Sequence, residues 1–151
     1  MRDDALTILP FAVSHLETLV LQPAQAAWQG ELCPDSLQAL EATGEAWSLL
    51  VRQRIIGCGG VQEQGGGRGL AWALLAQDAG PAMLAATRVV RRYLQASPYR
   101  RIEAATACSF APAARWAAML GFSSEGRMRA YCQDGGEAER WAYIIPDRQE
   151  S

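Results

Sequence analysis

The chain alternates short strand-like and helix-like patterns of apolar and polar residues, and no stretch of it repeats another. The elements that these patterns predict in the first half are a strand over 5–9, helices over 14–21 and 33–40, and strands over 46–52, 55–62 and 70–76. A tight turn at Gln53-Arg54 joins the first two of the later strands. The loop Gly65-Gly66-Gly67 joins the next two, so the three strands form a meander.

A long amphipathic helix is predicted over residues 81–96, after the meander. One face of this helix consists of Met83, Ala86, Thr87, Val90, Tyr93 and Leu94. Its other face carries Arg88, Arg91 and Arg92, the pattern of a helix that packs on a sheet and exposes a charged side. Ser97-Pro98 ends the helix, because the residue before a proline is disfavoured in helical geometry.

The last third of the chain predicts a strand, a helix and a final pair of strands. The strand covers 101–107, and the helix after Ser109 has a stripe of apolar residues and closes at Gly121. The last two strands, over 126–133 and 139–145, are joined by the turn sequence Asp134-Gly135-Gly136.

This order of elements predicts one α/β (α+β) domain over residues 1–151. It should contain a mixed central sheet of about six to seven strands flanked by about four helices. Pairing should be parallel where a helix connects two strands and antiparallel where a hairpin does. Ligands of such sheets bind at the carboxyl ends of strands, beside helix N-termini. Residues 74–84, LLAQDAGPAML, occupy that position.

The composition of the chain argues against several classes of partner and binding site. Half of the 151 residues are hydrophobic, and fourteen basic and sixteen acidic residues give a net charge of −2. With no run of Lys or Arg, we expect neither a nucleic-acid nor a membrane partner. The four cysteines are far apart and the single histidine is His15, so we expect no metal site and reduced thiols. No signal-peptide pattern or long apolar span is found, which favours a cytoplasmic protein.

Residues 100–145 contain three short motifs in a characteristic order: Leu120-Gly121-Phe122, Glu125-Gly126-Arg127 and the Asp134-Gly135-Gly136 turn. In order and spacing, this region resembles the second half of a GNAT (Gcn5-related N-acetyltransferase) domain. The resemblance extends over 46–145 and, more weakly, to the N-terminal helices within 12–43. It implies a GNAT-like fold with a cofactor-loop half over 46–96 and a C-terminal half over 100–145.

The same family binds acetyl-CoA at a loop of pattern Gln/Arg-x-x-Gly-x-Gly/Ala, and residues 77–82, QDAGPA, match each specified position. The resemblance implies a cofactor site formed by Leu74, Leu75, Ala76, Gln77, Ala79, Gly80, Ala82 and Met83. A pyrophosphate needs backbone N–H groups and the positive end of a helix. Pro81 lacks an N–H, Asp78 adds a carboxylate, and the strand-to-loop connection is shorter than usual. The alternative is that Gly80 makes a plain turn before the helix.

Members of the family commonly carry an Asn at the start of the following helix and a Tyr four residues before its Gly-Phe. The matching residues in this chain are Phe110 and Ala117. Four other residues are candidates for the catalytic roles: Glu63, Glu103, Ser109 and Tyr131. The two carboxylates could act as base, the phenol of Tyr131 on the sixth strand as acid, and Ser109 could replace the Asn. Each also has a structural reading, as a solvated strand carboxylate, a packed tyrosine or a helix cap.

A few further residues have two readings each. Cys108 could form an acyl-enzyme, but a small buried thiol is the simpler interpretation. His15 could line an acceptor site or be structural. Trp72 and Trp116 could wall a pocket or fill the core. The arginines at 88, 91 and 92 could meet the 3′-phosphate of CoA, a partner, or only solvent.

Two classes of function follow from the resemblance. The first is an N-acyltransferase that moves an acetyl group from acetyl-CoA to an amine of a small molecule or protein. The second is a GNAT-like protein without catalysis, retained as a structural or binding component with a protein partner. Compact chains of this kind also resemble, more loosely, GNAT-like proteins of tailed bacteriophages, some of them virion-associated. That resemblance implies a place in the host cytoplasm or the virion. A homodimer through the last hairpin is a further expectation.

Overall fold

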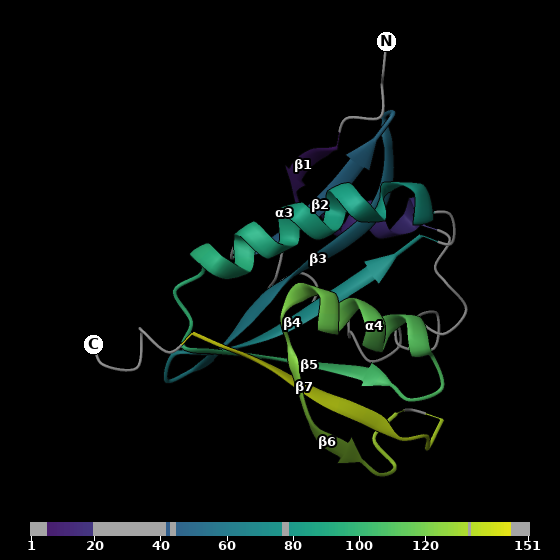
Figure 1. The fold of residues 1–151 in the computed structure, drawn as a ribbon. Helices are drawn as coiled ribbons and strands as arrows, with labels where there is room; N and C mark the ends of the chain where they lie inside the picture. The colour runs from purple at the N-terminus through teal and green to yellow at the C-terminus, as the bar shows by residue number, and fades with distance from the viewer. Residues whose placement is uncertain (1–5, 20–41, 43–44, 77–78, 133, 146–151) are drawn as a thin grey trace. The chain divides into compact units, whose positions relative to one another are not determined.

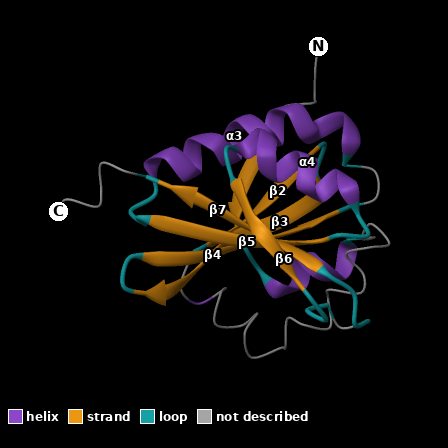
Figure 2. Ribbon diagram, turned by 60° about the horizontal axis from the view of Figure 1, so that its bottom comes forward, coloured by secondary structure: helices purple, strands orange, loops and turns teal. Residues whose placement is uncertain are grey.

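The computed structural model describes residues 6–19, 42, 45–76, 79–132 and 134–145. The elements in chain order are β1 (Thr7–Pro10), η1 (Val13–Thr18), β2 (Ala46–Val51), β3 (Arg54–Gly65), β4 (Arg68–Leu75), η3 (Gly80–Ala82), α3 (Met83–Ala96), β5 (Arg101–Ala107), α4 (Ala111–Leu120), β6 (Ser123–Met128) and β7 (Ala138–Ile144). The seven strands follow the order β1-β2-β3-β4-β5-β7-β6 (Figure 1). The predicted mixed sheet is therefore confirmed. The described residues form two α-helices and two 3-10 helices (Figure 2).

The chain divides into two compact units. One comprises Met1–Val61 with Trp72–Ala86, and the other comprises Gln62–Ala71 with Thr87–Ser151. We call them the N-terminal unit and the C-terminal unit and describe each by itself.

The N-terminal unit has an antiparallel core of β1, β2 and β3, with η1 packed against it. Its buried apolar cluster contains Phe11, Leu16, Ala46, Cys58 and Leu74. Trp72 is partly buried beside this cluster and meets Phe11 edge-on, with ring centroids 5.5 Å apart. Of the two readings of Trp72, the structure therefore supports core packing.

Close approach of two backbones explains the glycine at position 60. Gly60 lies opposite Ala46 in the β2–β3 ladder, and Ala46 is 1% exposed. A Cβ on Gly60 would lie 2.7 Å from the Cα of Ala46 and against the carbonyl of Glu45. Because both obstacles are backbone atoms, they cannot move aside as a flexible side chain would.

In the C-terminal unit, β5, β7 and β6 lie side by side as an antiparallel set, and α4 packs against β5. The start of β4 pairs with β5 in parallel. Trp116 of α4 donates a hydrogen bond from Nε1 to Oγ1 of Thr87 on α3, at 2.8 Å. The helix α4 ends as predicted, because Gly121 has a φ of 103° and the amide of Phe122 donates to Ala117.

Several local predictions need correction. The N-terminal helix is a 3-10 helix, Val13–Thr18, and the helix expected over 33–40 lies outside the described residues. Phe110, and not Ser109, is the N-cap residue of α4, without a side-chain cap bond. Strand β6 ends at Met128 and not near 133, because the chain turns at Arg129-Ala130 and Ala130 has a φ of 54°. No helix within the described segments is long and apolar enough to cross a membrane.

We expect Gly60→Ala to lower the free energy of unfolding by about 1–3 kcal/mol, as for other overpacked sites. Urea denaturation followed by tryptophan fluorescence measures this loss. Gly80→Ala is the matched control, because a Cβ on Gly80 meets no atom within 4 Å. Equal stability of the two variants would show that the β2–β3 approach is not as close as described.

Candidate functional site

The turn after β4 is the position at which the sequence predicts a cofactor. Leu74, Leu75 and Ala76 are 3%, 7% and 5% exposed, so their side chains belong to the core. The amide of Ala76 donates to the carbonyl of Ile56 at 2.9 Å, which holds the end of β4 against β3. Gln77 and Asp78 lie outside the described residues. The chain then continues through the fully buried Ala79 into η3.

The backbone N–H groups of this turn are mostly used within the turn itself. The amide of Ala79 donates to Ala76, that of Ala82 donates to Ala79, and that of Met83 donates to Gly80. Pro81 has no N–H. The amide of Gly80 has no acceptor among the described residues. Gly80 is also exposed, with open space where a side chain would start. Among the described residues of this turn, Gly80 thus combines an exposed backbone with an amide that has no acceptor.

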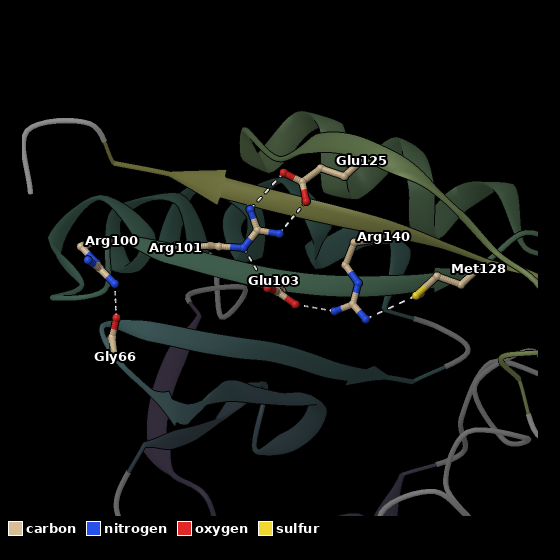
Figure 3. A network of polar contacts seen from close by, with 7 residues as sticks. All are labelled: Gly66, Arg100, Arg101, Glu103, Glu125, Met128 and Arg140. Carbon is tan, nitrogen blue, oxygen red and sulfur yellow. Dashed lines mark hydrogen bonds and ion pairs between the residues drawn. The ribbon is translucent and has the colours of Figure 1, made fainter. Parts of the chain in front are cut away.

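The parallel ladder between β4 and β5 is short. It pairs Arg68–Leu70 with residues 101–103, and among the described residues it includes no later pair. The glycine loop before β4 fixes this ladder, because the carbonyl of Gly67 accepts the amide of Arg100 at 2.8 Å and that of Arg101 at 3.4 Å. The guanidinium of Arg100 also donates to the carbonyl of Gly66 (Figure 3).

Three of the four predicted catalytic residues are exposed. Glu63 lies near the end of β3, and Ser109 lies in the turn between β5 and α4. The sequence predicts Tyr131 on a strand, but the structure places it in the connection between β6 and β7, with 40% of its surface exposed. Cys108 is exposed too, so its interpretation as a small buried thiol is wrong. The left-handed turn at Ala130 removes Tyr131 from the sheet.

Glu103, the fourth, lies in a chain of charged groups that joins β5, β7 and β6 (Figure 3). Its carboxylate accepts hydrogen bonds from Nε of Arg101 at 2.8 Å and from Nη1 of Arg140 at 2.6 Å. Arg101 also binds both carboxylate oxygens of Glu125, and Arg140 donates to the sulfur of Met128 at 3.3 Å. The sequence motif Glu125-Gly126-Arg127 thus contributes an ion pair across the strands.

These contacts decide what Glu103 can do. The hydrogen bond from Arg101 lowers the pKa of Glu103, and the charges of Arg101 and Arg140 lower it further against the effect of burial. The pKa of Arg101 is raised, chiefly by its hydrogen bonds to Glu125 and Glu103. A carboxylate with a lowered pKa is a weak base. The structure therefore favours Glu103 as an anchor of the sheet over Glu103 as a general base.

A second polar chain, in the N-terminal unit, was not anticipated from the sequence. His15 of η1 lies 2.6 Å from Ser48 of β2 through Nδ1, and Ser48 lies 3.4 Å from the sulfur of Cys58 on β3. The amide of Ala12 also donates to Nδ1 of His15, so this nitrogen is an acceptor and Ser48 is the donor toward it. The thiol of Cys58 is then left to donate to Ser48. Of the readings of His15, the structure supports the structural one.

The thiol of Cys58 is protected by its position. Burial raises the pKa of Cys58 to about 11, against a smaller opposite effect of its hydrogen bond with Ser48. The thiolate, the reactive form, is therefore rare near neutral pH. The sequence could not signal this chain, because its members come from three separate elements.

Phe110 and Ala117 occupy the positions at which the family commonly has an Asn and a Tyr, and their surroundings in the structure suit packing. Phe110 is the N-cap residue of α4 and is partly buried. Ala117 is 6% exposed and faces the packed side of the helix. A tyrosine at position 117 would have to displace neighbouring side chains, so this position serves packing.

This architecture is similar to that of several solved structures, although no similarity in sequence is detected. No protein-family model matches the chain, and no curated protein matches it in sequence. Among solved structures, a chimera of the spermidine N-acetyltransferase from Vibrio cholerae aligns with a TM-score of 0.70 and 16% identity, covering 97% of this chain and 99% of that chain. A GNAT-family acetyltransferase from Bacillus anthracis aligns with a TM-score of 0.62 and 14% identity, covering 95% and 96%.

This chain has the GNAT fold. A third GNAT-type neighbour is the microcin C7 self-immunity acetyltransferase, solved in complex with acetyl-CoA and AMP. It aligns with a TM-score of 0.62 and 14% identity, covering 95% of this chain and 94% of that chain. At these identities the likeness establishes the fold, and the activity has to be argued from the residues of this chain.

We expect Glu103→Gln to destabilise the protein by about 1–3 kcal/mol at neutral pH, because it leaves two arginines without their shared carboxylate. The pKa of Glu103 is lower in the folded state, so its contribution is present above the unfolded pKa near 4.5 and is lost as the pH falls through the folded value. Urea titrations at acid and neutral pH measure both effects. Glu125→Gln, at the exposed end of the chain of charges, should cost less. An equal cost in both variants would contradict the central place of Glu103.

Stability should also fall between about pH 9 and 11 because of Cys58. Its pKa rises from 9.0 to about 11 on folding, so its stabilising effect is complete below pH 9.0 and is lost as the pH rises through the folded value. The loss should amount to roughly 2–3 kcal/mol. Cys58→Ala should be less stable at neutral pH but lack this alkaline slope. A slope unchanged in the variant would assign it to another group.

Proposed function

We propose that this chain is a GNAT-type N-acyltransferase that binds acetyl-CoA and transfers its acetyl group to an amine. The GNAT fold supports the reaction class, and the turn at Gly80 supports the place of the cofactor. Two GNAT-type neighbours are consistent with it: one is a spermidine N-acetyltransferase chimera and one was solved with acetyl-CoA. The observation that carries the proposal is the exposed Gly80 at the start of η3, whose amide has no acceptor among the described residues and which lies three residues before α3.

The residues around the turn fit a pyrophosphate at one point of contact. The amide of Gly80 is available among the described residues, and the fourteen-residue helix α3 follows directly, so its positive end lies near the same place. Bound there, acetyl-CoA would supply an activated acetyl thioester. The apolar residues Leu74, Leu75 and Ala76 before the turn would hold the end of β4 in place beneath it. Gln77, Ala82 and Met83 complete the proposed site.

A lysine of this chain cannot be the acceptor. All fourteen basic residues of the chain are arginines, so the protein has no lysine of its own. Among its side chains there is therefore no ε-amine that could take the acetyl group. This simplifies the assay, because any acetyl-lysine that forms must be on the acceptor.

The proton transfers have less support than the cofactor site. Glu63, Ser109 and Tyr131 stay as proposed participants, since all three are exposed at the surface. A base need only accept a proton from the ammonium form of the acceptor, and the leaving thiolate takes one back. Glu103 is better explained by its ion pairs.

One observation favours a second candidate function, a GNAT-fold protein without catalysis that acts as a binding component. The family's Tyr position is the buried Ala117 and its Asn position is the N-cap Phe110, so neither usual side chain is available. In this case a protein partner, for example within a bacteriophage virion, would take the place of the substrate.

Acetyl-CoA should raise the melting temperature of the wild-type protein by about 5–10 °C at a ligand concentration 100-fold above Kd. Gly80→Glu should abolish the shift, because a carboxylate at this position repels a pyrophosphate. Gly80→Ala is the matched control and should retain most of the shift. Both variants should melt near the wild-type temperature without ligand, since the site has space for a Cβ.

The outcomes separate the two functions. A ligand shift together with acetyl transfer to a primary amine supports the acyltransferase. A shift without transfer to any amine tested supports a binding protein that keeps its cofactor site. No shift at millimolar acetyl-CoA would rule out the proposed cofactor, and a stoichiometric protein partner in purified material would then support the second function.

A further inference from the structure

The charged residues on the helices of the C-terminal unit are all positive. From Thr87 onward α3 carries Arg88, Arg91 and Arg92, and α4 carries Arg115. Neither helix contains an acidic residue, although the chain as a whole has a net charge of −2. The positive charge of this helical layer is therefore not part of a generally basic protein.

Two hydrogen bonds join the helices next to these arginines. Trp116 donates to Thr87 at 2.8 Å, and Arg91 donates from Nη1 to the carbonyl of Met119 at 3.4 Å. Because Arg91 of α3 contacts Met119 of α4 and Arg115 lies one helical turn before Met119, arginines of both helices lie beside the contact between α3 and α4. We call the residues Arg88, Arg91, Arg92, Arg115 and Met119 the arginine surface.

The arginine surface is exposed and, in the described part of the chain, none of its guanidinium groups pairs with a carboxylate. The sheet arginines Arg101 and Arg140 differ, since both are held by glutamates. Met119 is 56% exposed. It lies one helical turn after Arg115, which places an apolar side chain among the charges. Arginine together with exposed methionine is a composition typical of interaction surfaces.

We propose that the arginine surface binds an acidic protein segment that also carries an apolar residue. The carboxylates would pair with Arg88, Arg92 and Arg115, and the apolar residue would cover Met119. Arginine suits this role because its planar guanidinium binds a carboxylate through two hydrogen bonds. A nucleic acid is the poorer fit, because phosphate-backbone binding relies on a strongly basic domain and this chain has a pI of about 5.4. A phosphate backbone also offers no partner for Met119.

The test uses a fluorescent synthetic peptide of Asp-Glu-Leu triplets and follows its anisotropy as protein is added. The double variant Arg88→Glu/Arg92→Glu should weaken binding at least about tenfold, because each change replaces attraction by repulsion. It spares Arg91, which donates a hydrogen bond to the carbonyl of Met119 on α4. The control is Arg127→Glu/Arg129→Glu, the same change of charge on β6 and the turn after it, and it should bind like the wild type; it breaks only the exposed 3.8 Å ion pair of Arg127 with Glu137. Circular dichroism checks that both variants fold.

Two further measurements sharpen the result. An Asp-Glu-Gly peptide should bind more weakly than the Asp-Glu-Leu peptide to the wild type, and Met119→Ala should remove this difference. Equal binding of the two peptides to the wild type, or equal loss in the control variant, would overturn the proposal. So would tighter binding of a single-stranded oligonucleotide of the same charge. A loss of affinity for acetyl-CoA but not for dephospho-acetyl-CoA in the double variant would assign the arginines to the cofactor instead.

Discussion

Glu103 holds the C-terminal unit together through a requirement of electrostatics: a charge that is mostly removed from water needs a partner. Its carboxylate is bound by Arg101 on its own strand and by Arg140 on β7, and Arg101 continues the chain of charges to Glu125 on β6. Three strands are thus tied by groups whose side chains are only about a quarter exposed on β5 and β7. Removing Glu103 would leave Arg101 and Arg140 without their shared carboxylate, and this loss costs more than the intact pairs gain.

The turn after β4 depends on the hydrogen bonding of its backbone rather than on charged side chains. Short hydrogen bonds within η3 and the proline at position 81 use up most of the donors that a phosphate could bind, and only the Gly80 amide is available within the described turn. In the proposed function, an anion at this turn would be bound by few direct hydrogen bonds, and the partial positive charge at the N-terminal end of α3 would supply the rest of the attraction.

In the C-terminal unit, the strands and the helices differ in their charged residues. On the sheet, arginines and glutamates neutralise each other within the protein, while the helices carry arginines alone. Internal pairing stabilises a fold but leaves nothing for a partner to bind. The helix arginines beside the exposed Met119 pair with no carboxylate in the described part of the chain, and because the chain has no lysine, each of these charges is a planar guanidinium that can donate two hydrogen bonds.

The sequence by itself determined most of the elements that the structure describes and the order in which they occur. Periodicity and turn residues act between near neighbours, so the strand Arg101–Ala107 and the end of α4 at Gly121 could be read directly. The placing of the candidate catalytic groups was decided only by tertiary structure. Glu103 meets an arginine 37 residues away, and Ser48 lies between a histidine 33 residues before it and a cysteine 10 residues after it. Tyr131 left its expected strand because of the backbone conformation of one neighbouring residue. A side chain's chemistry depends on the groups that surround it in space, and those groups come from parts of the chain that no local pattern connects.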